Sequence, residues 1–99
     1  RLCGGISGLV KIADLARWFS VQLCPANAWS LLGTIAAAHA AVTLTNCQLI
    51  EVPAHIARLG EELLTPPPTI HDGFLLLSDE PGLGVGLKED LLARYRVGD

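Results

Sequence analysis

A single carboxylate, Glu51, ends a short apolar run and is the residue of this chain best placed for acid–base or hydrogen-bond chemistry. A second short run, residues 21–24, is followed by a loop through Ala26 and then by an almost wholly apolar stretch, residues 31–42. A strand, a loop and a helix in this order form a βα unit, and in a parallel barrel the loops after the strands carry the chemistry. We therefore expect Ala26 and Glu51 to open onto one shared mouth.

The cysteines and histidines do not form a recognisable ligand set. Cys3, Cys24 and Cys47 are odd in number and lack a CxxC spacing, which indicates reduced, intracellular thiols rather than a disulfide framework. We interpret them as small buried hydrophobic residues, and Cys24 is of interest because it ends a strand beside the expected mouth. His39 lies in the apolar stretch and is interpreted as a packed helix residue, and the other two histidines are too isolated to suggest zinc.

The elements that must position these residues alternate between helix and strand. We expect a helix over residues 8–19 with Ser7 as its N-cap, and a helix over residues 31–42 with Ser30 as its N-cap. The strand described above lies between these helices, and a further strand is expected over residues 47–50. This alternation is typical of α/β proteins with a parallel sheet.

The second half of the chain is less regular. We expect one or two helical turns within residues 54–64, a strand over residues 74–77 and a closing helix over residues 88–95. The apolar side chains expected to turn inward from the closing helix are Leu91, Leu92 and Tyr95. We therefore divide the chain into residues 1–52, the last βα units of a barrel, and residues 53–99, a tail. Two units cannot close a barrel of eight, so we expect the chain to be a portion of something larger.

Composition excludes several classes of protein. Hydrophobic residues make up 51% of the 99 residues and charged residues 17%, which is a low charged share for a free-standing domain of this size. We therefore expect some faces to cover other parts of a fold or a partner chain. The net charge of −3 and the lack of a basic stripe argue against nucleic-acid binding, and no apolar stretch is long enough to span a membrane.

Several short motifs, each weak by itself, occur together in one order along essentially the whole chain. They are Cys3-Gly4-Gly5-Ile6-Ser7-Gly8, then Pro25-x-Asn27-Ala28-Trp29-Ser30-x-x-Gly33-Thr34, then Leu49-Ile50-Glu51, and finally Asp72-Gly73 with Pro81-Gly82-Leu83-Gly84-Val85. With these motifs the sequence resembles the C-terminal part of the enolase superfamily, in the mandelate racemase and acid-sugar dehydratase group. The resemblance implies an α/β fold, the C-terminal segment of a (β/α)7β TIM-like barrel, with a tail that returns to an N-terminal capping domain.

The resemblance also implies a reaction: abstraction of the proton next to the carboxylate of a hydroxy or sugar acid, with Mg²⁺ as cofactor. Such a carbon acid is too weak for a side-chain base at neutral pH unless the charge developing on the carboxylate oxygens is neutralised. The family's metal ligands and lysine base lie on preceding strands, so no metal ligand is expected in this chain. Glu51 matches the strand-end carboxylate that hydrogen-bonds the substrate, a role that needs a carboxyl kept protonated by an apolar or anionic setting.

The loop after the first strand supplies the implied substrate-binding positions, which are Ala26, Asn27 and Trp29. A structural loop amide and a packing indole are equally good interpretations of the last two. Ala26 departs from the family pattern, which usually has a histidine there as general acid or base. Because alanine carries no proton, histidine-dependent racemisation or leaving-group protonation should be absent. A branch that relies on lysine alone, a divergent non-catalytic homologue and an engineered substitution all explain this departure.

Two functions from different classes follow. The first is the C-terminal portion of a dehydratase or racemase that is inactive as this segment alone. The second is a structural or assembly segment of a homologue that has lost catalysis. For either function the expected partners are the remaining barrel and the capping domain, in the same or a separate chain, and for the enzyme a small-molecule carboxylate. The resemblance further implies a cytoplasmic protein and a homo-oligomer.

Overall fold

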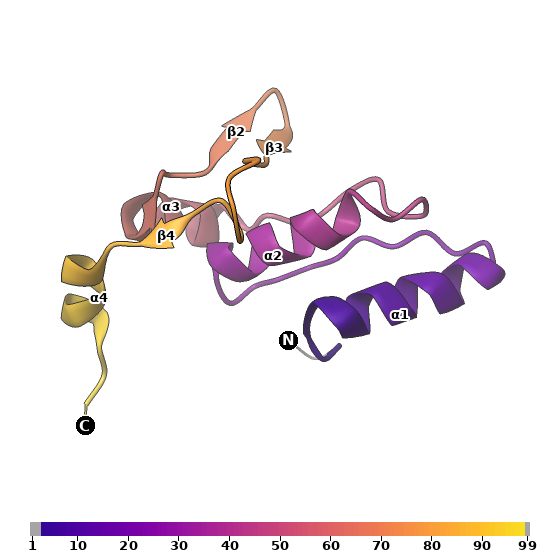
Figure 1. The fold of residues 1–99 in the computed structure, drawn as a ribbon, viewed down its shortest axis with the longest axis horizontal. Coiled ribbons are helices and arrows are strands. Elements are labelled where there is room, and N and C mark those ends of the chain that lie inside the picture. The colour runs from indigo at the N-terminus through magenta and orange to yellow at the C-terminus, as the bar shows by residue number, and fades with distance from the viewer. Residues whose placement is uncertain (1–2, 99) are drawn as a thin grey trace.

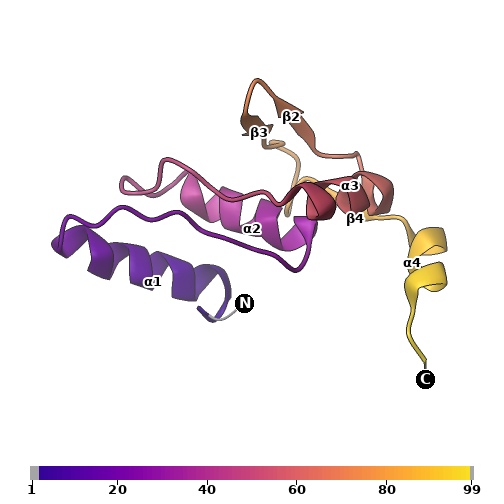
Figure 2. The ribbon, with the colours of Figure 1, turned by 180° about the vertical axis from the view of Figure 1, so that it is seen from behind.

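The computed structural model describes residues 3–98, in which two helices and two strand-like segments form the first half of the chain. Helix α1 spans Gly5–Trp18 and helix α2 spans Leu31–Ala41. The two helices pack side by side, and the segments around residues 23 and 47 run along them (Figures 1 and 2). Asn46, which is buried, ties these parts together, because its amide donates to the carbonyls of Ala13 in α1 (3.0 Å) and Val21 (3.1 Å).

Helix α1 begins earlier than the sequence predicts. Its N-cap is Gly4, with φ 83° and no side-chain cap, so the prediction of Ser7 as N-cap is wrong. A glycine in the left-handed region turns the chain straight into the helix, and Ser7 lies within the first turn. The polar cap signal at Ser7 is therefore overridden by the glycines that precede it.

Helix α2 confirms the prediction from Ser30. The Ser30 Oγ accepts a hydrogen bond from the Gly33 backbone N–H (3.1 Å), as an N-cap does. No side chain of this helix is exposed, and the buried residues are Leu31, Thr34, Ile35, Ala38, Ala40 and Ala41. Small alanine side chains allow this close approach, because α2 lies between α1 on one side and α3 on the other.

Helix α3 spans Ala54–Leu63 and closes the core. The buried core cluster consists of Leu31 and Ile35 from α2, Ile56 from α3, and Leu64. Gly60 of α3 faces Leu31 so closely that a methyl group there would overlap the Leu31 side chain. The prediction of one or two helical turns is therefore confirmed and extended to ten residues.

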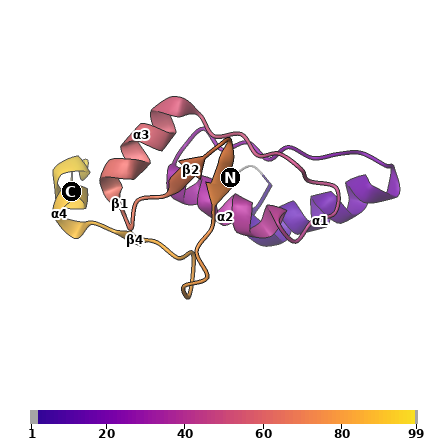
Figure 3. The same cartoon turned by 90° about the horizontal axis from the view of Figure 1, so that it is seen from above.

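The tail contains two small antiparallel sheets. Strand β1 (Leu64–Thr65) pairs with β4 (Gly86–Leu87), and β2 (Thr69–His71) pairs with β3 (Phe74–Leu76). The β2–β3 hairpin stands away from the helices in Figures 1 and 2, and in the view from above its ribbon overlaps that of α2 (Figure 3). Only β3 matches a predicted strand. The loop before β4 is held to α2 by His39, whose Nε2 lies 3.2 Å from the Leu83 carbonyl oxygen.

Helix α4 spans Glu89–Tyr95 and lies at the opposite end of the molecule from α1 (Figure 1). Leu92 is 38% exposed and Tyr95 54% exposed, so the prediction that both turn inward is wrong for the described chain, and only Leu91 is half-buried. No element among residues 3–98 covers this side of α4. None of the described helices is long and apolar enough to cross a membrane.

Candidate functional site

The two predicted strand ends lie next to each other. Leu23 pairs with Cys47 and Ala26 pairs with Glu51, both in parallel. The Leu23 N–H donates to the Asn46 carbonyl (2.8 Å), and the Glu51 N–H donates to the Pro25 carbonyl (2.9 Å). Parallel pairing places both C-terminal ends at the same edge. The structure therefore brings Ala26 and Glu51 together, as the sequence predicts.

The register between these strands changes by one residue. Between the two bridges the chain takes three steps on the first strand, from 23 to 26, but four on the second, from 47 to 51. One extra residue on one strand is the arrangement of a β-bulge, and bulges redirect side chains near active sites. Here it pairs Glu51 with Ala26, so that both side chains are exposed.

Side chains along the first strand alternate in burial. Leu23, Pro25 and Asn27 are half-buried, while Cys24 and Ala26 are exposed. In a strand, successive side chains point to opposite faces. Cys24 and Ala26 therefore share the outer face away from the helices. The interpretation of Cys24 as a buried hydrophobic residue is wrong, and the period-two pattern is the signal that could have shown it.

The thiol of Cys47 has a raised pKa. Burial raises the pKa of Cys47 above its ordinary value, the nearby Cys24 raises it further, and a hydrogen bond from Sγ to the Leu49 carbonyl (3.6 Å) acts in the opposite direction. The Cys47 thiol is therefore protonated and unreactive near neutral pH.

Asn27 is engaged within its own loop. Its Oδ1 accepts a hydrogen bond from the Trp29 backbone N–H (3.0 Å), and its Nδ2 donates to the Ser30 carbonyl (3.2 Å). The structural interpretation of this amide is therefore observed directly. Its contact with a substrate stays a prediction that only the remaining N–H could satisfy.

Trp29 is 71% exposed at the tip of the same loop. It lines an apolar groove of about 140 Å³ between the start of α2 and helix α3. The other apolar side chains in this groove include Leu32, Ile56, Leu59 and Leu63. The indole thus presents hydrocarbon surface beside the strand ends, which suits either packing or contact with an apolar part of a ligand.

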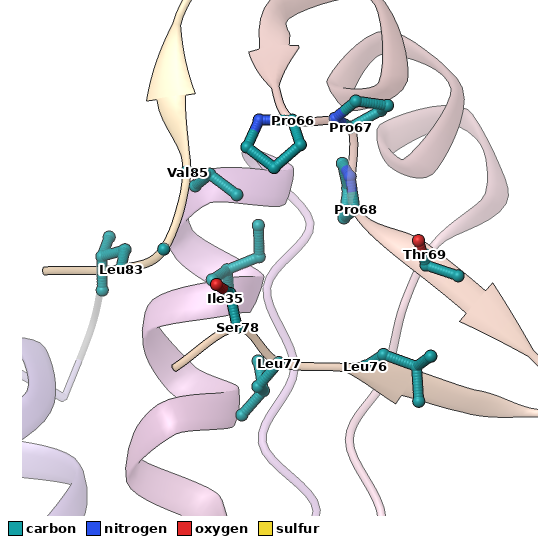
Figure 4. Close-up of a pocket in the computed structure, with 11 residues that line it drawn as sticks. Ile35, Pro66, Pro67, Pro68, Thr69, Leu76, Leu77, Ser78, Leu83 and Val85 are labelled. Carbon is teal, nitrogen blue, oxygen red and sulfur yellow. The ribbon is translucent and has the colours of Figure 1, made fainter. Parts of the chain in front are cut away.

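Two further depressions, each larger than this groove, lie elsewhere. One, of about 210 Å³, is formed by α2, the three prolines at 66–68 and the loop before β4 (Figure 4). The other, of about 620 Å³, lies between α2, residues 47–52 and the β2–β3 hairpin, with mainly apolar walls. Neither is lined by Ala26, Asn27, Trp29 or Glu51.

The described residues do not fit a divalent metal ion by themselves. Among residues 3–98 no three His, Cys, Asp or Glu side chains lie close enough to hold one. His39 Nε2 lies within hydrogen-bond distance of the Leu83 carbonyl oxygen, in keeping with the interpretation of a packed histidine. On the surface, His71 Nε2 lies 3.3 Å from the Asp72 carboxylate. A metal at this site would need ligands from outside the described chain.

The chain is similar in sequence to curated proteins over most of its length. The chain is 30% identical over 94 residues to a D-xylonate dehydratase from Haloferax volcanii and 29% identical over 98 residues to an o-succinylbenzoate synthase from Bacillus subtilis. These alignments cover 95% and 93% of the chain but only 23% and 25% of the relatives. The chain therefore spans about a quarter of the length of the curated relatives that it matches.

Solved structures also resemble this chain over most of its length. A mandelate racemase/muconate lactonizing enzyme-like protein from Rubrobacter xylanophilus superposes with a TM-score of 0.80 at 31% identity, over 97% of this chain and 25% of that one. The α/β fold expected from the sequence, the C-terminal part of a TIM-like barrel, is confirmed. The family model described as "Enolase C-terminal domain-like" matches residues 2–91. The chain accordingly belongs to the enolase C-terminal domain-like family.

Proposed function

We propose that this chain is the C-terminal portion of a Mg²⁺-dependent enzyme that abstracts the α-proton of a hydroxy or sugar acid, as a dehydratase or racemase. The active unit is completed by the remaining barrel strands and a capping domain, on which residues 53–99 pack. The named relatives support this class, because one is a D-xylonate dehydratase and another a D-galactonate dehydratase family member. We further propose that the enzyme is a cytoplasmic homo-oligomer.

The pairing of Ala26 with Glu51 carries this proposal. It brings one exposed carboxylate and one exposed methyl group to the same edge, with the Trp29 loop alongside. Glu51 would hydrogen-bond the substrate carboxylate and hold it in place. Ala26, Asn27 and Trp29 would form the adjoining wall of the pocket. Because residues 3–98 hold no metal-ligand cluster, the Mg²⁺ ligands are assigned to the missing strands.

The test is deuterium incorporation at the α-carbon. The full-length protein is incubated in D₂O with Mg²⁺ and D-xylonate, D-gluconate or mandelate, and exchange is measured by mass spectrometry. We expect exchange with at least one acid, lost on addition of a chelator. The Glu51→Gln variant keeps the shape of the side chain but loses the carboxyl, and we expect about a 100-fold lower rate.

A second function, a non-catalytic structural segment, is favoured by one observation. Ala26 occupies the strand end beside Glu51, and its side chain cannot carry a proton. If Ala26 stands where a catalytic histidine has been lost, Ala26→His should restore activity in an inactive protein. No exchange in either the wild type or the Ala26→His variant would leave the structural function as the better account.

A further inference from the structure

We propose that Asn27 is a positioning residue: its side-chain amide locks the loop of residues 25–30 onto the first turn of α2, and so holds Ala26 and Trp29 beside Glu51. It acts through the backbone of the loop and needs no contact with the substrate. This inference rests on the proposed function for its effect on catalysis. The lock itself is a property of the fold and can be tested without activity.

The first part of the lock is the amide. Asn27 Oδ1 accepts from the Trp29 N–H (3.0 Å) and Nδ2 donates to the Ser30 carbonyl (3.2 Å). Asparagine side chains that bond the backbone two residues ahead replace the bonds of a regular turn. Both ends of the amide therefore fix the path of the chain between the strand and the helix.

The second part is the anchor in α2. The Ser30 carbonyl that receives Nδ2 also accepts from the Thr34 N–H (3.1 Å) and from Thr34 Oγ1 (3.3 Å). Thr34 is 1% exposed, and the Ser30 Oγ caps the Gly33 N–H (3.1 Å). The amide is thus attached to the N-cap carbonyl of α2, which the buried Thr34 also bonds.

The third part is Gly33. A methyl group at this position would overlap Asn27 Nδ2 and lie only 3.3 Å from Ser30 Oγ. Glycine inside a helix costs about 1 kcal/mol relative to alanine. Its presence in the first turn of α2 is explained by the amide that packs over it. Asn27 and Gly33 are therefore complementary parts of one contact.

Displacement of this loop would reach the site directly. Ala26 precedes Asn27 in the chain and is itself paired with Glu51. A shift of about 1 Å in the groups that surround a reacting carbon can cost about 100-fold in rate. Loss of the lock should therefore lower the rate without removing any group that touches the substrate.

The experiment compares Asn27→Ala, Asn27→Asp and Gly33→Ala in a Trp18→Phe background of the full-length protein. Trp18 is the other tryptophan of the 99 residues, and phenylalanine keeps an apolar ring at this position. We expect Asn27→Ala and Gly33→Ala to lower the fluorescence anisotropy of Trp29 and to reduce α-deuterium exchange on D-xylonate, D-gluconate or mandelate by 10- to 100-fold. Asn27→Asp keeps the acceptor for the Trp29 N–H but loses the donor, so it should fall between these variants and the wild type.

Gly86→Ala is the matched control, because a methyl there meets nothing closer than 3.6 Å. Unchanged anisotropy in Asn27→Ala and Gly33→Ala would overturn the lock. If Asn27 touched the substrate instead, Asn27→Ala would lower the rate and leave the anisotropy of Trp29 unchanged, which also overturns the proposal. If circular dichroism shows that Asn27→Ala does not fold, the anisotropy and exchange rates of Asn27→Asp and Gly33→Ala test the lock in its place. Absence of exchange in the wild type would count against the proposed function, and the anisotropy would still decide the lock.

Discussion

At the scale of single residues, the pair Ala26 and Glu51 defines what this part of the molecule can do. Their backbones pair at the same edge, yet only Glu51 can exchange a proton. Proton transfer from this edge therefore involves one group, and any second acid or base must come from elsewhere in the complete protein. Ala26 therefore supplies neither an acid nor a base at this edge.

The Cys47 thiol allows a test by pH. Because burial and the nearby Cys24 raise the pKa of Cys47, its alkylation by iodoacetamide should begin at higher pH than that of a free thiol, whose pKa is 9.0. Its protonated form favours the folded state, so this contribution to stability is present below about pH 9 and is lost as the pH rises through the folded value.

The measurement is the labelling rate of each cysteine against pH by mass spectrometry. The Cys24→Ser variant should lower the pKa of Cys47 toward its ordinary value without restoring it, since burial is the larger cause. A labelling profile for Cys47 identical to that of a free thiol would contradict the described burial.

At the scale of elements, the first half of the chain was predictable and the tail was less so. Residues 31–42 carry both a cap signal at Ser30 and a long apolar run, and the helix forms where they indicate. Strand β2 (Thr69–His71) could not be predicted from its own residues, because it is three residues long and all three are exposed. Such short strands are defined by their partner, here β3, and by the turn at Asp72 and Gly73, both with positive φ.

The candidate site, too, could be predicted only in part. The nearness of Ala26 and Glu51 follows from the βα pattern, because consecutive parallel strands end at one edge. The bonds of Asn27 could not be predicted, since they depend on the path of a loop and on the space above Gly33. Leu92 stays exposed among the described residues, so its predicted inward turn fails.

The packing of α3 on α2 predicts the effect of Gly60→Ala. A methyl at Gly60 would overlap the Leu31 side chain, including its Cβ, which cannot move without the backbone of α2. We expect a loss of about 1–3 kcal/mol in the free energy of unfolding, measured with urea, despite the better helix propensity of alanine. Gly86→Ala, where a methyl would meet nothing closer than 3.6 Å, should change the unfolding midpoint little. Equal midpoints for the two variants would contradict the close contact.

At the scale of the whole molecule, the exposed apolar surface is large for a chain with 17% charged residues. Leu15, Trp18 and Phe19 of the α1 region are 63%, 84% and 73% exposed, and the two aromatic residues follow Leu15 by three and four positions. Residues at this spacing form one stripe on a helix. A stripe of this kind on a soluble protein is normally covered by another surface.

We therefore expect the 99-residue chain, produced alone, to associate with itself in sedimentation experiments at micromolar concentrations. The double variant Leu15→Glu and Trp18→Glu should reduce this association, because it places charges on the stripe. Arg17→Glu, which reverses one exposed charge on another side of α1, is the control and should change it little. A monomeric wild-type chain would show that the stripe does not need a cover.

The one-residue difference in register between the paired strands has a consequence for how the chain tolerates change. Substitutions at Gln48 or Leu49 leave the count of backbone positions before Glu51 intact. Deletion of either residue would remove the extra position and leave three steps on each strand, so the acidic side chain would stay opposite Ala26 on the outer face. The direction of the acid is therefore set by its pairing with Ala26, and we expect this segment to tolerate the loss of one residue.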